Sequence, residues 1–201
     1  MTMTNDMTGV FRRAWTEMLL PILQRPKRLQ VAALCYRQTP KGKQVLLITS
    51  GAIGMGAGPL KLKGPVADLK LRQACAAVGQ PLLMHEYHKA FTEIGLVVSQ
   101  VLLTAEVLNK RKSYLNLRNA IERLLDLGVI PIVNENDTVM TQEIQFGDND
   151  NLAAMITLLM DADILVNLTD IDGLYTKDPR TNPDAALIPV VSTMGKDIIK
   201  F

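Results

Sequence analysis

The 201-residue sequence predicts an α/β protein, a three-layer αβα sandwich with a mostly parallel sheet. Short apolar segments of strand length alternate along the chain with segments of helical periodicity, which is the pattern of repeated strand–helix–strand units. Hydrophobic residues make up 48% of the chain but aromatic residues only 4%, so the core is aliphatic, as in parallel sheets covered by helices on both faces. Charged residues make up 21%, and this composition excludes general disorder.

Short apolar runs predict four buried strands, at residues 45–49, 96–103, 129–133 and 164–168. Helical spacing predicts helices at residues 67–91, 109–127 and 152–160. The segment Gly79-Gln80-Pro81 should break the first helix, and Gly128 should end the second. The buried face of the second helix is expected to carry Leu115, Ile121, Leu124 and Leu125.

The start of the chain differs in character from the rest. Proline and basic residues are frequent before residue 44, and residues 1–28 are expected to be a divergent or poorly ordered segment ahead of a domain at 29–201. A basic arm that binds RNA or lipid is the alternative reading of this segment. The net charge is only +2, from 22 basic and 20 acidic residues, so the whole chain gives no general case for a nucleic-acid partner.

The two cysteines, Cys35 and Cys75, stand far apart and form no Cys-x-x-Cys motif. This usage excludes a disulfide scaffold and a structural zinc cluster, and it indicates a cytoplasmic protein. No apolar run approaches the roughly 20 residues that span a bilayer, so no membrane partner is expected.

Polar clusters follow three of the predicted strands, and ligands of parallel sheets gather at the carboxyl ends of strands. Ser50-Gly51 opens a glycine-rich turn that could hold an anion against backbone N–H groups or could be only a tight turn. The run from Asn134 to Asp137 could bind a zwitterion, since carboxylates accept from an ammonium and amides donate to a carboxylate. Thr169-Asp170 opens a loop that could hold a nucleotide or be an ordinary surface loop.

A fourth cluster, Gly147-Asp148-Asn149-Asp150-Asn151, opens the helix predicted at 152–160. One Asp or Asn would serve as an N-cap, but capping does not require four in a row. Two adjacent carboxylates repel one another unless a cation joins them, which favours a role with lysine, an ammonium group or Mg²⁺. The pattern lacks the spacing of an EF-hand loop.

Taken in order, five motifs resemble those of bacterial glutamate 5-kinases, members of the amino acid kinase family. They are Ile48-Thr49-Ser50-Gly51-Ala52-Ile53, Gln73-Ala74-Cys75-Ala76-Ala77-Val78-Gly79-Gln80, residues 130–137, residues 146–152, and residues 169–180. The last motif is shared with aspartate kinases, whereas Asn-Glu-Asn-Asp followed by Gly-Asp-Asn-Asp is more particular to glutamate 5-kinases. The resemblance covers roughly three quarters of the chain, and it implies the amino acid kinase fold, apparently incomplete.

The resemblance implies transfer of the ATP γ-phosphoryl group to the side-chain carboxylate of L-glutamate, giving L-glutamyl 5-phosphate, the first step of proline biosynthesis. It further implies ATP and Mg²⁺ as cofactors and a homo-oligomer. Matching positions suggest substrate binding by Ser50, Gly51, Asn134, Asp137, Asp148 and Asn149, nucleotide binding by Thr169 and Asp170, and a catalytic role for Asp150, which would organise catalytic lysines; no residue is assigned to a metal.

The sequence departs from the family pattern at both ends. Residues 1–28 contain no Lys-x-Gly-[Ser/Thr] motif, and the family's Gly-Thr-Gly-Gly-Met segment does not occur before Phe201. The alternative expectation is therefore a non-catalytic remnant that keeps the fold and the glutamate site. Another acid or phosphate kinase of the same fold is a third option.

Overall fold

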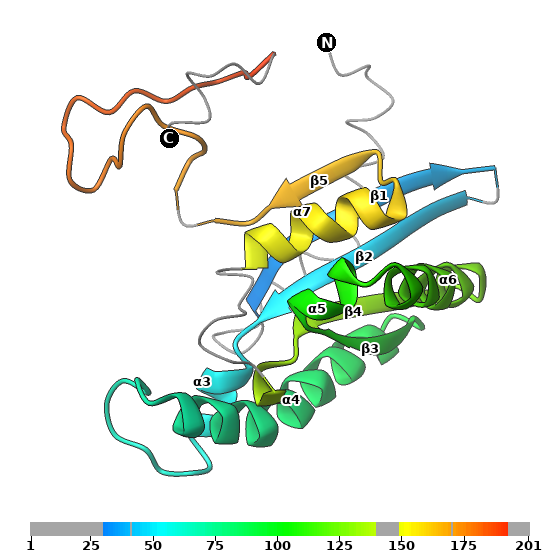
Figure 1. The fold of residues 1–201 in the computed structure, drawn as a ribbon, viewed down its shortest axis with the longest axis horizontal. Helices are drawn as coiled ribbons and strands as arrows, with labels where there is room; N and C mark the ends of the chain where they lie inside the picture. The colour runs from blue at the N-terminus through cyan, green and yellow to red at the C-terminus, as the bar shows by residue number, and fades with distance from the viewer. Residues whose placement is uncertain (1–29, 41, 140–148, 170, 193–201) are drawn as a thin grey trace. The chain divides into compact units, whose positions relative to one another are not determined.

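The part of the chain that ends at Asn167 is built around a five-stranded sheet with the strand order β3-β4-β2-β1-β5 (Figure 1). The computed structural model describes residues 30–40, 42–139, 149–169 and 171–192. The strands are β1 (Gln30–Thr39), β2 (Gly42–Ser50), β3 (Val97–Leu103), β4 (Val129–Glu135) and β5 (Ile164–Asn167). The neighbours β3, β4 and β2 are parallel, while β1 runs antiparallel to both β2 and β5. The mixed but mostly parallel sheet confirms the predicted fold class.

Strand β1 is the main departure from the prediction, which places no strand before residue 45. It enters the sheet between β2 and β5, and its residues Leu34, Cys35 and Tyr36 are buried. Its run Val31–Tyr36 is apolar and of strand length, like the runs that predicted the other strands, but its central and antiparallel place depends on partners distant in the sequence. The turn to β2 is closed by the Thr39 hydroxyl, which donates to the carbonyl oxygen of Gly42 at 2.9 Å. Residues 1–28, with their predicted divergent segment, lie outside the described residues.

The helices are α3 (Ala52–Ala57), α4 (Leu69–Thr92), α5 (Ala105–Asn109), α6 (Arg111–Asp126) and α7 (Asn149–Met160), with a 3₁₀ turn, η2 (Asp137–Val139). The predicted break at Gly79-Gln80-Pro81 is wrong, because α4 continues through Pro81. In the second half of α4 the side chains of Leu83, Tyr87 and Phe91 are fully buried, and the Tyr87 hydroxyl contacts Thr49 of β2. Tertiary packing of this kind outweighs the hydrogen bond that a proline removes from a helix.

Helix α6 ends as predicted, at Gly128. This residue has a φ of 74°, a left-handed conformation that costs glycine little, and its N–H donates to the carbonyl oxygen of Leu125 at 3.0 Å. Ile121 and Leu125 are buried, but Leu115 is 46% exposed, so its predicted place on the buried face is wrong. The predicted helix 109–127 matches α6 within two residues, and the short helix α5 before it was not predicted; Lys110, in an extended conformation, separates the two.

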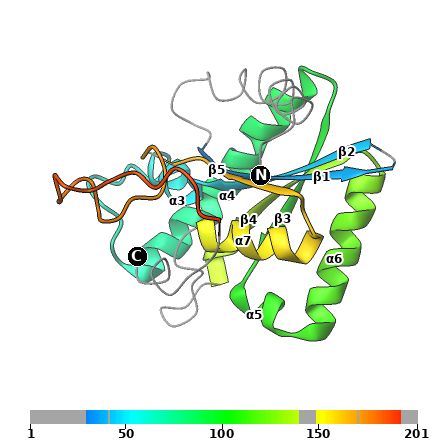
Figure 2. The ribbon, with the colours of Figure 1, turned by 90° about the horizontal axis from the view of Figure 1, so that it is seen from above.

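The sheet is covered on both faces. Helices α6 and α7 lie on the same side (Figure 2), where they pack on strand residues that include Cys35, Leu46 and Ile48. Successive strand side chains point to opposite faces, so Thr49 faces the other side, where its hydroxyl lies 2.7 Å from the hydroxyl of Tyr87 on α4. Burial raises the pKa of Tyr87 to about 12, an effect that the hydrogen bond to Thr49 opposes. These contacts give the three predicted layers.

Both cysteines are free and buried. Burial raises the pKa of the Cys35 thiol, and its hydrogen bond to the Thr157 hydroxyl works in the opposite direction. Within the described ranges, no helix combines the length and the apolar character needed to cross a bilayer.

Candidate functional site

Two neighbouring strands deliver polar residues to the same edge of the sheet. Strands β2 and β4 are parallel and paired through Ile48 and Val133, so their carboxyl ends lie together beside α3 (Figure 1). After β2, Gly51 takes a φ of 100° and turns the chain directly into α3. After β4, the N–H of Asn136 donates to the carbonyl oxygen of Leu103 at 2.7 Å, and η2 follows. The two turns form the floor of a cavity.

This cavity, which we call the strand-end cavity, has a volume of about 170 Å³. It is lined by Ser50, Gly51, Ala52, Ile53, Arg72, Asn134, Glu135, Asp137 and Asn149. The structure thus brings together five of the residues predicted to bind substrate, from β2, β4, η2 and the start of α7. The volume is below the ~300–1,000 Å³ typical of pockets for drug-sized ligands, so it suits a small metabolite.

The other predicted site residues do not line this cavity. Asp150 is exposed in the first turn of α7, next to Asn149 but outside the lining set. The chain forms two compact units, Met1–Asn167 and Leu168–Phe201, and Thr169 belongs to the second. Asp148 and Asp170 lie outside the described residues. Their predicted roles therefore stay predictions.

Two polar side chains at the site, both from α4, lie outside the predicted polar clusters and had no predicted role. Arg72 of α4 lines the cavity, and Gln80 of the same helix contacts Asn134. Gln80 closes one of the motifs that carried the family resemblance, which was the available signal for it. Nothing in the local sequence distinguishes Arg72 from other basic residues on exposed helix faces, because only the packing of α4 brings it to the end of β4.

A hydrogen bond to Gln80 positions the side chain of Asn134. Both side chains are buried, and the Asn134 Nδ2 donates to the Gln80 Oε1 at 2.9 Å. Within the described part of the chain, the Gln80 Nε2 is buried without a hydrogen-bond partner. The bond fixes the amide plane of Asn134 where it borders the cavity.

Replacing Gln80 by leucine should lower the free energy of unfolding. The change leaves the Asn134 amide without its acceptor, which costs about 1–3 kcal/mol. It also removes the buried Nε2 that has no hydrogen-bond partner, and this gain offsets part of the cost. We expect a net loss of about 1 kcal/mol, measured by urea unfolding. Gln100→Leu, at an exposed position of β3, is the control and should change little. Equal losses in both variants would contradict a structural role for the Gln80–Asn134 bond.

Asp137 is half-buried, and two opposing effects act on the pKa of its carboxyl group. Burial raises the pKa of its carboxyl group, and the positive charge of Arg72 opposes the rise. The charged form of Asp137 is therefore less stable in the folded chain than in water. A positively charged ligand group at this position would stabilise the charged form of Asp137, which burial destabilises.

Asp137→Asn should make the folded chain more stable at neutral pH. A carboxyl group whose pKa is raised on folding contributes most to stability at pH values below its pKa in the unfolded chain. This contribution is lost as the pH rises through its pKa in the folded chain. The urea midpoint of the variant should exceed that of the original chain at pH 7, and the difference should shrink toward pH 4. Asp161→Asn, at an exposed position, controls for the loss of one charge. A difference that is constant with pH would contradict the prediction.

Backbone contact between α3 and α4 positions the turn at Gly51. A Cβ on Gly79 would overlap the carbonyl oxygen of Ala52, and a Cβ on Gly56 would overlap the carbonyl oxygen of Cys75. Glycine at both positions lets the two helices approach at van der Waals distance. This contact fixes the carboxyl end of β2 relative to α4, the helix that carries Arg72 and Gln80.

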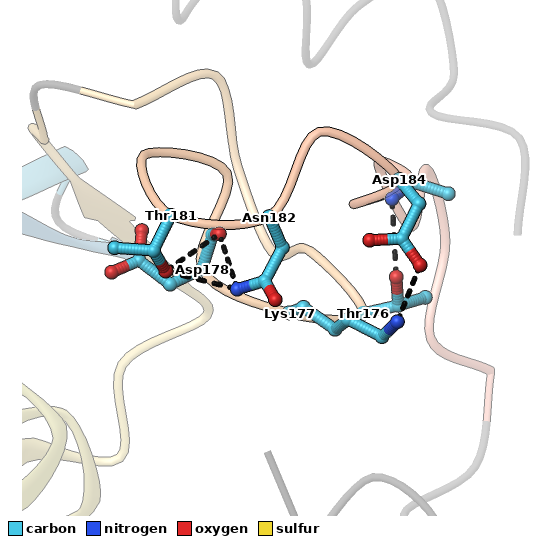
Figure 3. A network of polar contacts seen from close by, with 7 residues as sticks. Thr176, Lys177, Asp178, Thr181, Asn182 and Asp184 are labelled. Carbon is cyan, nitrogen blue, oxygen red and sulfur yellow. Dashed lines mark hydrogen bonds and ion pairs between the residues drawn. The ribbon is translucent and has the colours of Figure 1, made fainter.

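The second unit contains an ordered loop with its own cavity, of about 510 Å³. Tyr175 and Leu187 form an antiparallel bridge, and the Asp178 carbonyl oxygen accepts from both the N–H and the Nδ2 of Asn182 at 3.0 Å (Figure 3). The Asp178 side chain caps the next turn by accepting from the N–H of Arg180 at 2.9 Å. The cavity is lined by Ile171, Gly173, Leu174, Tyr175, Lys177, Asp178, Pro179 and Arg180.

The described residues contain no group of three or more His, Cys, Asp or Glu side chains that could hold a metal ion. In phosphoryl transfer, Mg²⁺ is commonly held by nucleotide phosphates with one or two carboxylates, and a protein cage is not required. The acidic residues near the strand-end cavity are compatible with that kind of site.

The chain is similar to known proteins along most of its length. Residues 23–194 match the model of the amino acid kinase family. Glutamate 5-kinase of Moorella thermoacetica is 53% identical over 161 residues, which are 80% of this chain and 43% of the relative. Glutamate 5-kinase of Caldanaerobacter subterraneus subsp. tengcongensis is 51% identical over the same shares, and that of a Thermoanaerobacter species is 48% identical over 90% of this chain and 48% of the relative.

This chain spans less than half the length of those curated relatives. The motif resemblance to glutamate 5-kinases is nevertheless confirmed, because identities of 48–53% extend over at least 80% of this chain. The sheet, the helices on both of its faces and the family match agree with one another, and the chain belongs to the amino acid kinase family.

Proposed function

We propose that this chain binds L-glutamate in the strand-end cavity and takes part in transfer of the ATP γ-phosphoryl group to its side-chain carboxylate. The product is L-glutamyl 5-phosphate, and the reaction is the first step of proline biosynthesis. The observation that carries the proposal is the convergence of Ser50, Asp137 and Asn149 on one small cavity. The name of the relatives, glutamate 5-kinase, supports the same substrate.

The lining of the cavity has the chemistry that an acidic amino acid needs. Asp137 supplies a carboxylate for the α-ammonium group, while the amides of Asn134 and Asn149 and the hydroxyl of Ser50 can donate to carboxylate oxygens. A charged ligand group is held best by such partly buried, oriented partners. The volume of the cavity, about 170 Å³, accommodates an amino acid and is too small for a whole nucleotide.

In the proposed step, an oxygen of the substrate side-chain carboxylate attacks the γ-phosphorus of ATP. The bond from the γ-phosphorus to the bridging oxygen breaks, and ADP leaves with the electron pair. Both reactants are anions, and two unit charges ~4 Å apart repel by about 4 kcal/mol at an effective dielectric constant near 20. Catalysis is therefore a matter of positioning and of positive charge around the transferred group.

The nucleotide is proposed to bind along the loop that begins at Thr169 and Asp170. Support comes from the loop cavity, whose lining includes the aromatic ring of Tyr175 and the cations of Lys177 and Arg180. Mg²⁺, when bound with ATP, would neutralise charge on the phosphates. Asp150 is proposed to organise the cations that meet the transferred phosphoryl group, since an aspartate cannot neutralise an anion itself.

Two further expectations belong to this proposal. A homo-oligomer is supported by the exposed apolar side chains of Leu71, Val78 and Leu82 on α4, each 36–39% exposed. A cytoplasmic location is supported by the two unpaired cysteines. Sedimentation velocity of the purified chain tests the first expectation.

The test of function is a hydroxamate assay with ATP, Mg²⁺, L-glutamate and hydroxylamine, which traps the acyl phosphate. Calorimetric titration with L-glutamate runs beside it, and L-aspartate, N-acetylglutamate and UMP serve as competing acceptors. Glutamate-dependent hydroxamate supports the proposal. Glutamate binding without product would instead support a non-catalytic chain that keeps the substrate site, and absence of glutamate binding would overturn the proposal.

A further inference from the structure

Arg72 stands in the first turn of α4, the helix that begins at Leu69. The turn is capped by Asp68, whose side chain accepts from the N–H of Leu71 at 2.9 Å, so the backbone that carries Arg72 is well defined. Arg72 is half-buried and lines the strand-end cavity. Among the described residues that line this cavity, it is the only cation, and Glu135 and Asp137 are the acidic residues of the same lining.

Arg72 and Asp137 interact across the cavity without closing on each other. The charge of Arg72 stabilises the ionised form of Asp137. No ion pair within 4.0 Å involves Arg72 in the described part of the chain, although surface pairs such as Arg118–Glu122 do form. Two opposite charges that line one small cavity and form no ion pair with each other match a ligand that carries a positive and a negative group close together.

An α-amino acid has that arrangement, because its ammonium and carboxylate groups are attached to the same carbon atom. We propose that Arg72 binds the α-carboxylate of the acceptor amino acid while Asp137 binds its α-ammonium group. This inference rests on the proposed function, in which the acceptor is L-glutamate. The planar guanidinium fork matches a carboxylate through two parallel hydrogen bonds, which fixes the orientation of the ligand as well as its position.

Holding the α-carboxylate has a consequence for the reaction. L-Glutamate carries two carboxylates, and only the side-chain group is to be phosphorylated. With the α-carboxylate occupied by Arg72, the side-chain carboxylate is the one left to approach the nucleotide. Arg72 is thus a specificity-determining and positioning residue, and it need not touch the transferred phosphoryl group.

The test is calorimetric titration of the full chain with L-glutamate and with L-glutamate α-amide, in which the α-carboxylate charge is removed. We expect the original chain to bind the α-amide at least tenfold more weakly than glutamate. Arg72→Gln should weaken glutamate binding about 10- to 100-fold. It should leave α-amide binding nearly unchanged, because the α-amide has no α-carboxylate charge for Arg72 to bind. Arg72→Lys, which keeps the charge but not the fork, should fall between the two.

Arg111→Gln is the matched control, because Arg111 is an exposed arginine in the first turn of α6 and does not line the cavity. Unchanged glutamate affinity in Arg72→Gln, or equal losses for glutamate and the α-amide, would overturn the inference and leave the proposed function standing. If the original chain binds no glutamate, the proposed function fails and the inference fails with it. Should Arg72→Gln not fold, the Arg72→Lys titrations and the α-amide comparison on the original chain decide, and equal affinities for the two ligands refute the role.

Discussion

Gly79→Ala should lower the free energy of unfolding by about 3 kcal/mol or more, at the upper end of what overpacking costs. The new Cβ would overlap the carbonyl oxygen of Ala52 and lie 2.5 Å from the backbone nitrogen of Gly56. Backbone atoms cannot rotate away as a side chain can, so α3 must move away from α4. Because α3 follows directly on Gly51, the shift should also weaken glutamate binding. Urea unfolding followed by circular dichroism measures the first effect, and calorimetry measures the second.

Gly54→Ala is the matched control on α3. A Cβ at Gly54 meets no atom within 4 Å, and alanine is the better helix former by about 1 kcal/mol, so this variant should be as stable as the original chain or more so. Similar urea midpoints for Gly79→Ala and Gly54→Ala would show that the two helices are not in backbone contact. That result would also remove the link between α4 and the edge of β2.

Asp150→Asn should reduce glutamate-dependent hydroxamate formation by about 10²–10³-fold, the usual cost of losing one preorganised electrostatic group. The substitution keeps the size of the side chain and removes its charge, so the cations that Asp150 is proposed to organise lose their anchor. Glutamate affinity should stay within about twofold, since Asp150 does not line the strand-end cavity. Rate and affinity are measured on the same preparation by the hydroxamate assay and by calorimetry.

Two comparisons make this prediction specific. Asn149→Ala, one residue earlier on α7, should weaken glutamate binding because Asn149 lines the cavity. Asp161→Asn, beyond the other end of α7, removes one exposed carboxylate and should leave both rate and affinity unchanged. A loss of glutamate affinity in Asp150→Asn as large as that in Asn149→Ala would make Asp150 a substrate ligand and contradict the catalytic assignment.

Local sequence patterns were sufficient for the strands that lie parallel in the sheet. The runs at Val45–Thr49 and Val129–Val133 are apolar, bounded by polar or glycine residues, and both fall inside observed strands. Gly128 also ended its helix as predicted, because a residue with positive φ is a local requirement that glycine meets. Such features depend on a few neighbouring residues and can be read without knowledge of the fold.

Features that depend on distant partners could not be read in this way. The apolar run of β1 is compatible with a strand, but it does not specify that β1 lies between β2 and β5 and runs antiparallel to both. The passage of α4 through Pro81 depends on burial of Leu83, Tyr87 and Phe91 in the core.

The same division holds for the candidate site. By itself, the sequence determined the α/β class and the positions of Ser50, Asn134, Asp137 and Asn149 as polar residues next to strands and a helix start, since each cluster stands beside its own element. Only the tertiary structure decided that these residues share one cavity, that Asp150 lies outside its lining, and that Arg72 faces Asp137 across it. The physical reason is that an ordered cavity is made by packing: the close approach of α4 to α3, permitted by Gly56 and Gly79, joins groups that are separated by many residues along the chain.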